Sequence, residues 1–451
     1  MKVDLRNKKV SIIGAARSGI AAAYLAKRQG AQVFLSDATL PEDHDKLRKD
    51  FSEKKIDFEF GEHTDKLYDC DVLVTSPGVP TNSEVLIKAS NLGLTINSEI
   101  EFASWFTNAK IIGITGTNGK TTTTALTNFI LQSCGKKSVS AGNIGNAFSL
   151  IADQATEDTI IILEISSFQL DHINSFRPNV AVLLNITPDH LERYENKFQK
   201  YIDSKFRITK NLSIDDLFIY NLDDDVILKN LQKNDFRKQS FSILKEIENG
   251  ISVVGNKVYF KFNERNEELI SANEILIKGS HNLYNAMAAS LAAKFFGCPN
   301  DRIKKALQEF RGVEHRLEFV RTLRGVTFIN DSKATNVRST YFALNSYDQL
   351  IILILGGREK GNVYQEIIEP VKQKVKLILA IGEAKEKIEK EFAEIKKVIK
   401  CNSLEDAVIT GFEKSAESDI LLLSPACKSF DMFKDFEHRG RRFKEIVNEI
   451  K

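Results

Sequence analysis

The sequence predicts an α/β protein of three domains, each built around a largely parallel sheet. The chain has 451 residues, and at about 150 residues per domain this length suggests three domains. Short apolar runs alternate with helical segments from end to end, which is typical of parallel strands joined by crossover helices. Glycine-rich turns join strand to helix at two places. The expected domains are residues 1–108, 109–312 and 313–451.

Composition argues against several functional classes. The net charge of +2 gives no reason to expect a nucleic-acid or membrane-surface partner. The five cysteines are widely spaced and form no C-x-x-C pair, so neither a disulfide framework nor a thiolate metal site is predicted. No signal peptide precedes the first strand, and no apolar run approaches the about 20 residues needed to span a bilayer. We therefore expect a cytoplasmic enzyme without nucleic acid or membrane span.

The first domain has a Rossmann-like opening. KVSIIG is expected to be a buried strand, GAARSG a tight turn, and QVFLSD a second strand that ends at Asp37. Ala16 occupies the position of the second glycine of the dinucleotide fingerprint, where a side chain hinders close approach of a pyrophosphate. This methyl group argues against NAD without excluding another nucleotide. Strand-like runs at residues 71–78 and 94–102 follow, and Gly78 forms another strand-end turn.

The stretch IIGITGTNGKTTTTAL, residues 111–126, predicts a phosphate-binding loop that opens the central domain. Backbone N–H groups and the helix dipole attract an anion at such a turn. Lys120 would contact the β- and γ-phosphates, and the Thr121 hydroxyl would ligate Mg²⁺. The spacing departs from G-x₄-G-K-[ST], because the upstream glycines are Gly113 and Gly116 and neither lies five residues before Gly119. A glycine-rich turn with a solvated lysine therefore stays open as an alternative.

Polar side chains follow the later strands of this domain. Glu164 ends the apolar run TIIILE, where an acid that orders Mg²⁺ is expected; an N-cap or a surface ion pair is the alternative. The next strand delivers Asn185, Asp189 and His190 to one loop, at the edge where α/β proteins bind ligands. A helical pattern then contains Lys205. Taken by itself, Lys205 is expected to be a solvated helix lysine.

The pattern changes at residues 236–278. GISVVGNKVYFKF alternates around a Gly-Asn turn, which indicates a hairpin, and we expect a small antiparallel β insert. The following KGSHNLYNAMAAS returns to helix, with Ser280 as N-cap. Asn282 and Asn285 then lie on one helical face, at i, i+3 spacing.

The last third predicts a second Rossmann-like α/β domain. Strands are expected at residues 326–331, 350–357, 375–381 and 419–424. Each ends in a glycine-containing or polar turn: DSKATN, GGREKGN, GE and SPACKSFD. This arrangement is typical of an open sheet that binds ligands at one edge.

Eight motifs run through the chain in a fixed order: TGTNGKTTT, EISSFQL, NITPDHLERY, YIDSKFRI, GSHNLYNAMAA, EHRLEF, NDSKATN and SPACKSFDMFKDFEHRG. Together they resemble the ATP-dependent Mur ligases, and among these the branch that joins D-glutamate to UDP-N-acetylmuramoyl-L-alanine in peptidoglycan precursor synthesis. One motif is a weak signal, but eight in order from the first strand to the last helix are specific. The resemblance implies small-molecule substrates, and we expect a monomer.

The resemblance also assigns site residues. ATP would be bound by Gly116, Thr117, Asn118, Gly119, Lys120, Thr121, Thr122, Asn282, Asn285, Arg316 with His315 beside it, Asp331 and Lys333. The UDP-linked substrate would contact Arg17, Ser18, Asp37, Gly78, Asn143 and Ser166, and D-glutamate would contact His190, Thr335, Lys360, Ser429 and Phe436. One Mg²⁺ would be held by Thr121 and Glu164, and a second by His190 and an N-carbamylated Lys205. The implied catalytic set is Lys120, Glu164, His190, Lys205 and Arg316.

The implied reaction is a two-step acyl transfer through an acyl phosphate, with ATP as phosphoryl donor. Two departures from the family pattern affect ligand contacts. Val363 stands where relatives often have an acid, and Ala38 and Thr39 stand near where some relatives carry an arginine beside the uridine pyrophosphate.

Other functions remain possible at this stage. A Mur-type or folylpolyglutamate-type ligase with another acceptor would use the same mechanism, although the Rossmann-like first domain argues against folate. A nicotinamide-dependent dehydrogenase could be built on the GAARSG turn, but Ala16 and the phosphate loop argue against it. A non-catalytic nucleotide-binding regulator would be expected to lack Glu164, His190 or Lys205, and all three are present.

Overall fold

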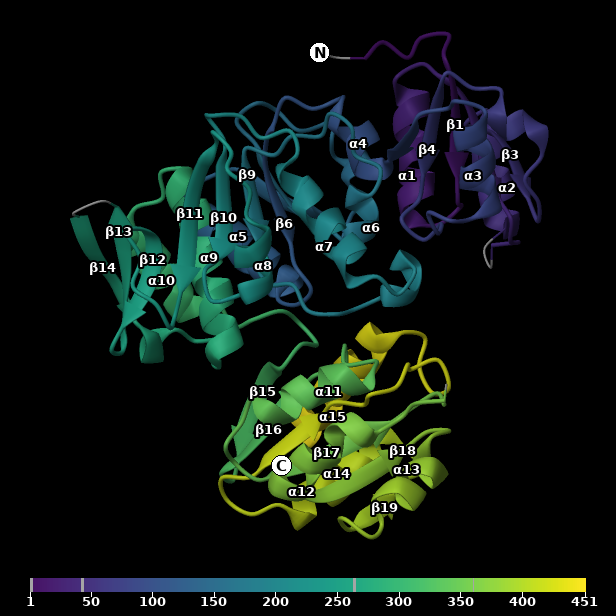
Figure 1. Cartoon of the computed structure of the whole chain (residues 1–451). Helices are drawn as coiled ribbons and strands as arrows, with labels where there is room; N and C mark the ends of the chain where they lie inside the picture. The colour runs from purple at the N-terminus through teal and green to yellow at the C-terminus, as the bar shows by residue number, and fades with distance from the viewer. Residues whose placement is uncertain (1–2, 42–43, 263–264, 360) are drawn as a thin grey trace. The chain divides into compact units, whose positions relative to one another are not determined.

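Three sheets organise the chain in the computed structural model, which describes residues 3–41, 44–262, 265–359 and 361–451 (Figure 1). The chain forms two compact units, Met1–Leu276 with Ser280–Phe310, and Ile277–Gly279 with Arg311–Lys451. The first two sheets belong to the first unit and the third sheet to the second. The α/β class with three sheet domains is thus confirmed. The finer limits 1–108, 109–312 and 313–451 remain a prediction.

The first sheet is parallel throughout, in the order β3-β2-β1-β4-β5. The order reverses between β1 and β4, so the turns after these two strands flank a switch point, where α/β folds bind ligands. Alanines and a leucine of α1 are buried against this sheet, which explains the small side chains of IAAAYLA. The elements are β1 (Lys9–Ile13), α1 (Arg17–Arg28), β2 (Gln32–Asp37), α2 (His44–Glu53), β3 (Asp57–Phe60), β4 (Val72–Thr75), α3 (Glu84–Asn91), β5 (Ile96–Ser98) and α4 (Glu99–Ser104).

The central sheet has the order β14-β13-β12-β11-β10-β9-β6-β8-β7, with parallel pairs from β7 to β12. Strand β6 lies between β9 and β8 and leads into the phosphate loop. The strands are β6 (Lys110–Thr115), β7 (Ser138–Gly142), β8 (Ile160–Glu164), β9 (Val180–Leu183), β10 (Leu217–Asn221), β11 (Arg237–Ser242), β12 (Asn249–Val254), β13 (Lys257–Phe262) and β14 (Arg265–Ser271). The helices are α5 (Lys120–Ser133), α6 (Ser167–Leu170), α7 (Phe198–Phe206), α8 (Asp225–Asn230), α9 (Ser280–Phe295) and α10 (Asn300–Glu309).

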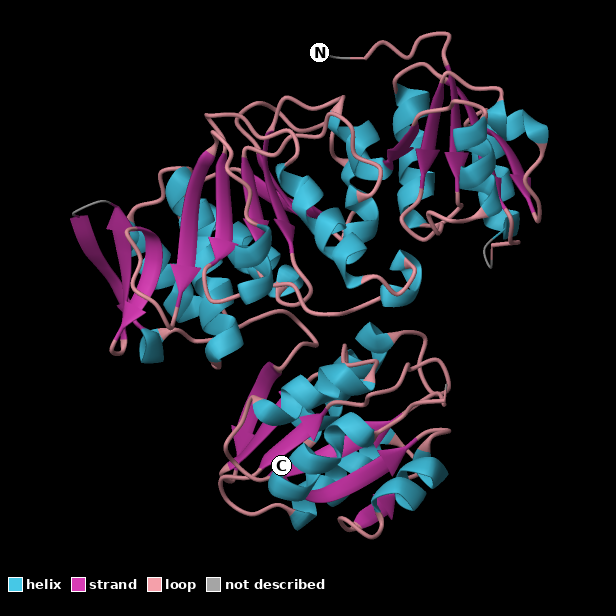
Figure 2. Ribbon diagram, in the orientation of Figure 1, coloured by secondary structure: helices cyan, strands magenta, loops and turns pink. Residues whose placement is uncertain are grey.

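The third sheet has the order β15-β16-β20-β17-β18-β19, and only its edge strand β15 is antiparallel among the described strands. Two separate apolar cores cover its faces, one formed with α11, α12 and α13 and the other with α14 and α15 (Figure 2). The elements are β15 (Glu318–Leu323), β16 (Val326–Asn330), α11 (Val337–Asn345), β17 (Ile351–Gly356), α12 (Ile368–Lys374), β18 (Val375–Ile381), α13 (Lys385–Phe392), β19 (Val398–Lys400), α14 (Leu404–Lys414), β20 (Ile420–Leu423) and α15 (Phe436–Glu449).

One detail of the sequence prediction is wrong. Residues 94–102 are not one strand: β5 ends at Ser98, whose side chain caps helix α4 by accepting the Glu101 N–H. The predicted antiparallel insert is confirmed: β12 pairs with β13, and β13 pairs with β14. Strand β12 pairs in parallel with β11, so the hairpin extends the central sheet. Periodicity could not show this, because it does not report which strands are neighbours.

The described helices are short. The longest, α9, has 16 residues. None of them is both long and apolar enough to cross a membrane.

Candidate active site

The phosphate loop lies between β6 and α5, as the sequence predicts. Its backbone turns through two glycines, Gly116 at φ 150° and Gly119 at φ 85°. A Cβ at Gly119 would lie 2.3 Å from Oδ1 of Asn285, so only glycine allows this approach. The Lys120 ammonium donates to the carbonyl oxygens of Gly116 (2.9 Å) and Thr117 (2.8 Å). The loop is therefore a folded anion cradle at a helix N-terminus, with Thr121 and Thr122 buried in the first turn of α5.

Asn185, on the loop after β9, holds the phosphate loop in shape. Its carbonyl oxygen accepts the Thr117 N–H (2.9 Å), and its side chain exchanges two hydrogen bonds with the backbone of Asn118 (2.8 and 3.0 Å). The Thr117 hydroxyl extends this contact, since it pairs with the backbone of Thr187 and with the hydroxyl of Tyr201. Sequence reasoning placed Asn185 on the right loop but missed this clamping role.

Glu164 is buried at the end of β8, with 2% of its surface exposed. Its Oε1 accepts the side-chain N–H of Asn143 at 3.0 Å, and its Oε2 is buried without a hydrogen-bond partner among the described residues. A buried carboxylate oxygen without a partner is unfavourable unless a cation or donor completes it. This is neither the N-cap nor the surface ion pair considered from the sequence. It fits a metal ligand.

Lys205 is buried rather than solvated, with 1% of its surface exposed, so its reading as a surface helix lysine is wrong. Helix α7 points its ammonium at the Gly116 carbonyl oxygen (2.8 Å), the oxygen that Lys120 also binds, and its Nζ lies 4.6 Å from the centre of the Tyr201 ring. Burial, and then the nearby charge of Lys120, lower the pKa of Lys205 well below its ordinary value. Burial of this kind favours the uncharged amine over the ammonium.

His190 lies on the loop after β9 but is more exposed than the other candidate ligands. Its backbone is left-handed at φ 51°, and its ring packs edge-on against Phe168, with centroids 5.3 Å apart. Its nearest carboxylates are those of Asp189 (3.8 Å) and Glu192 (3.7 Å). Among the described residues, no cluster of three or more His, Cys, Asp or Glu could hold a metal ion by itself. A metal ion bound by Glu164 or His190 would therefore need further ligands, such as the Thr121 hydroxyl and substrate oxygens.

Asn282 and Asn285 share one face of α9, as expected. The Asn285 side chain donates to Oδ1 of Asn282 (3.2 Å) and accepts from the Thr123 hydroxyl (3.2 Å). Asn285 is buried and so links α9 to the phosphate-loop helix, while Asn282 is half-buried.

The first-domain candidates gather around the switch point. The Asp37 carboxylate accepts the N–H groups of Ala15 (2.6 Å) and Thr39 (2.8 Å), so it shapes both turns. The Arg17 side chain reaches the central domain, where its guanidinium donates to the Asn143 carbonyl oxygen at 2.9 Å. Ser18 is half-buried in the first turn of α1. No atom lies within 4 Å of a Cβ built on Gly78, so the space above this turn is open.

Ser166 caps α6 in a reciprocal pair with Gln169: its hydroxyl accepts the Gln169 N–H, and the Gln169 side chain accepts the Ser166 N–H. The cap fixes the start of the EISSFQL segment next to Glu164. Together with Asn143, which donates to Glu164, Ser166 lies at the carboxyl end of the central sheet.

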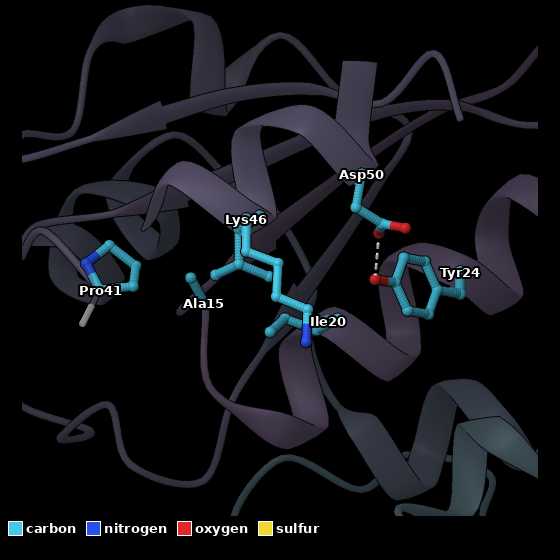
Figure 3. Close-up of a pocket in the computed structure, with 7 residues that line it drawn as sticks. Ala15, Ile20, Tyr24, Pro41, Lys46 and Asp50 are labelled. Carbon is cyan, nitrogen blue, oxygen red and sulfur yellow. Dashed lines mark hydrogen bonds between the residues drawn. The ribbon is translucent and has the colours of Figure 1, made fainter. Parts of the chain in front are cut away.

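A pocket of about 490 Å³ opens between α1 and α2, next to the end of β2 (Figure 3). Its walls include Ala15, Ile20 and Pro41, and the Lys46 side chain extends into it. The Asp50 carboxylate at its edge accepts a hydrogen bond from the Tyr24 hydroxyl. The lining thus combines apolar side chains with the polar groups of Tyr24, Lys46 and Asp50.

In the second unit, Asp331 follows β16 and is buried. Its carboxylate accepts the Ser424 hydroxyl (2.8 Å) and the Leu317 N–H (3.2 Å), and burial raises its pKa to about 7. Arg316 is half-buried and lies between two left-handed residues, His315 at φ 65° and Leu317 at φ 44°. Such strained turns are common at functional sites.

The His315 ring is buried and pairs with the Asn330 side chain (3.0 Å). A Cβ at Gly440 of α15 would lie 2.2 Å from His315 Nδ1, so this glycine makes room for the ring. The ring thus anchors the strained turn that carries Arg316.

Two candidate D-glutamate residues of this unit, Thr335 and Ser429, lie on turns that Arg439 joins. This buried arginine, missed from the sequence, donates to the Ser332 hydroxyl (3.0 Å) and carbonyl (2.8 Å) and to the Cys427 carbonyl (3.1 Å). It thereby links the DSKATN and SPACKSFD turns. The remaining candidates have these positions: Ser429 is buried, Thr335 and Phe436 are half-buried, the Lys333 ammonium lies 5.9 Å from the Phe436 ring centre, and Lys360 lies outside the described residues.

Three family profiles match the chain. Profiles of the MurD N-terminal domain, the Mur ligase middle domain and the Mur ligase glutamate ligase domain match residues 9–85, 114–293 and 315–427. The chain is 43% identical to UDP-N-acetylmuramoylalanine--D-glutamate ligase of Chloroherpeton thalassium, over 98% of both chains. It is 40% identical to the ligase of the same name from Salinibacter ruber, over 99% of both.

Solved structures show the same fold at lower identity. The UDP-N-acetylmuramate-alanine ligase MurC of Thermotoga maritima aligns over 99% of this chain and 100% of its own, with TM-score 0.58 and 19% identity. MurF ligase of Thermotoga maritima, in complex with ADP, aligns over 99% and 96%, with TM-score 0.57 and 14% identity. The full-length identity above 40% is the decisive finding: the chain belongs to the UDP-N-acetylmuramoylalanine--D-glutamate ligase family of Mur ligases.

Proposed function

We propose that this chain joins D-glutamate to UDP-N-acetylmuramoyl-L-alanine at the expense of ATP, in peptidoglycan precursor synthesis. The observation that carries the reaction class is the convergence of Lys120 and Lys205 on the Gly116 carbonyl of a folded phosphate loop. The similarity to full-length ligases of this name supports the acceptor and the UDP-linked substrate.

The reaction has two steps in which every bond is accounted for. A carboxylate oxygen of the L-alanyl group bonds to the γ-phosphorus while the bond to the β,γ-bridging oxygen breaks, which gives ADP and an acyl phosphate. The D-glutamate nitrogen then bonds to the acyl carbon, phosphate leaves, and the nitrogen loses a proton. The chain's task is to align these groups and to stabilise charge on the phosphoryl oxygens.

The phosphate loop supplies the ATP site in this proposal. Residues 116–122 surround the phosphates through backbone N–H groups at the N-terminus of α5, and Lys120 leaves its carbonyl partners to pair with phosphate. From the second unit, Arg316 pairs with phosphate, and Asp331 and Lys333 contact the ribose and phosphates. Asn282 frames the adenine. Asn285 acts indirectly, because its side chain is already bound to Asn282 and Thr123.

Two Mg²⁺ ions fit this proposal. Thr121 and Glu164 would hold one, a role that the unpartnered Oε2 of Glu164 supports. His190 and Lys205 would hold the other, provided that Lys205 is carbamylated: the neutral amine adds to CO₂ and loses a proton, which converts a cation into a carboxylate ligand. The lowered pKa of Lys205 favours this reaction. Bound Mg²⁺ would neutralise charge on the phosphate oxygens.

The substrates would occupy the remaining candidate residues. The uridine lies in the pocket between α1 and α2, beside Asp37, and the rest of the UDP-linked substrate runs past Gly78, Ser18 and Arg17 toward Asn143 and Ser166. By the resemblance to the family, the residues that would bind D-glutamate are His190, Thr335, Lys360, Ser429 and Phe436. All five cysteines are free, which is consistent with a reducing cytoplasm. The monomeric state stays a prediction.

Phosphate release tests this function. Purified protein receives ATP, Mg²⁺, UDP-N-acetylmuramoyl-L-alanine and one amino acid from a panel of D-glutamate, L-glutamate, L-alanine and meso-diaminopimelate. We expect sustained release with D-glutamate alone, and none when the UDP-linked substrate is omitted. Release only with another amino acid would contradict the acceptor, and release with none would contradict the function.

A further inference from the structure

Arg193 stands out because it is a half-buried cation without an acidic partner. Burial lowers its pKa, although the charge of Asp171 acts in the opposite direction, and its Nε is buried without a hydrogen-bond partner. Among the described residues, no carboxylate lies within ion-pair distance of it. A guanidinium removed from water in this way carries a desolvation cost. Something other than a salt bridge must therefore account for its position.

On one side, Arg193 contacts the first domain. Its Nη2 donates to the carbonyl oxygen of Val79 at 2.6 Å. Val79 closes the turn after β4, because its N–H donates to the carbonyl of Ser76. The Ser76 hydroxyl in turn donates to the carbonyl oxygen of Gly14 at 3.2 Å. Arg193 thus holds the turn that contains Gly78 and that packs on the glycine turn before α1.

On the other side, Arg193 contacts the central domain. Its guanidinium lies over the Phe168 ring, 3.9 Å from the centroid. Phe168 also packs against His190 and stacks on Tyr194, with centroids 5.3 and 6.2 Å apart. It lies two residues after Ser166. One side chain therefore touches both the first-domain turn and the aromatic cluster beside His190.

We propose that Arg193 is a positioning residue: it fixes the position of the first-domain turn at Gly78 relative to the His190 loop of the central domain. This inference rests on the proposed function, in which one long substrate must reach from the uridine pocket to the phosphate loop. An error of about 1 Å at the reacting carboxylate can cost 10²-fold in rate. A planar guanidinium suits the role, because it donates in its plane while its face lies on an aromatic ring.

Substitutions of Arg193, with a matched control at Arg28, test the inference. Arg193→Met keeps the length of the side chain but removes its charge and donors, and Arg193→Lys keeps the charge but loses the planar fork. Arg28→Met is the matched control: Arg28 also reaches from the first domain to the central domain, where it pairs with Asp153 (2.8 Å) and the Ser149 carbonyl (3.1 Å), but it lies at the far end of α1.

We expect Arg193→Met to lower kcat/KM for the UDP-linked substrate by about 10- to 100-fold, with the KM for ATP within twofold of wild type. Arg193→Lys should be impaired to a lesser degree, and Arg28→Met should stay within twofold for both substrates. Phe168→Leu should weaken the effect of Arg193→Met in a double-mutant cycle, because both changes break the same contact.

Three outcomes would overturn the inference. The first is unchanged kinetics in Arg193→Met, and the second is an equal loss of activity in Arg193→Met and Arg28→Met. The third is a rise in the KM for ATP in Arg193→Met as large as the rise in the KM for the UDP-linked substrate, which indicates general misfolding. If Arg193→Met does not fold, Arg193→Lys decides by the same comparison. Absence of D-glutamate ligation in the wild-type protein would contradict the proposed function instead, so the two failures are distinguishable.

Discussion

Replacing Lys205 by alanine is expected to lower ligation by about 10³-fold, the scale of losing one charge-stabilising group in phosphoryl transfer. The buried Nζ is bound to the phosphate loop itself, through the Gly116 carbonyl, so its loss removes a group from the reacting centre. Added bicarbonate should not restore the variant, because alanine offers no amine to carbamylate. Steady-state phosphate release measures the effect.

Lys200→Ala is the matched control on the same helix. Lys200 is exposed and pairs with Glu195, so its loss should change activity by less than twofold. Carbamylation itself is read by ¹³C NMR after equilibration with ¹³C-bicarbonate: the carbamate resonance should be present in wild type and Lys200→Ala and absent in Lys205→Ala. Full activity in Lys205→Ala would contradict the proposed carbamylation of Lys205. An active wild-type protein without this resonance would contradict it as well.

Glu164→Gln is expected to lower kcat by at least about 10²-fold, because it removes the negative charge proposed to hold Mg²⁺ while it keeps the shape of the side chain. The Asn143 contact to Oε1 can persist in the variant, since a glutamine oxygen still accepts it. Titration calorimetry gives a readout independent of turnover. Mg²⁺ should tighten ADP binding to wild type, and it should do so much less in Glu164→Gln.

Asn143→Ala separates the effect of losing the Asn143–Glu164 hydrogen bond from the effect of losing the Glu164 charge. It removes the hydrogen bond to Glu164 but leaves the carboxylate, so Mg²⁺ should still tighten ADP binding in that variant. If Glu164→Gln responds to Mg²⁺ as wild type does, Glu164 is not a metal ligand.

The sequence predicted the elements that carry the site better than the contacts between them. The strand before Gly116, the helix that begins at Lys120 and the strand that ends at Glu164 are present because local apolar runs and glycine turns specify them. The exposure of Lys205 could not be predicted from its own helix. Its burial depends on the phosphate loop, a segment about 90 residues earlier in the chain.

The same limit explains the contacts that were missed. Asn185, Arg193 and Arg439 act on backbone atoms of distant turns, and neither their type nor their spacing signals this. A half-buried arginine without an acidic partner, such as Arg193, becomes visible only when its surroundings are known. The division of residues 94–102 into strand and helix was missed for a local reason: Ser98 and Glu101 form a helix start that the apolar run conceals.

Transfer of a labelled oxygen tests the central claim most directly, since it follows the substrate carboxylate itself. UDP-N-acetylmuramoyl-L-alanine with both carboxylate oxygens replaced by ¹⁸O is incubated with ATP, Mg²⁺, D-glutamate and the wild-type protein. Phosphate is examined by ³¹P NMR and the product by mass spectrometry. We predict one ¹⁸O in each released phosphate and one in the new amide of a product enlarged by one glutamyl residue. Phosphate without ¹⁸O, or no glutamyl product, would contradict the account.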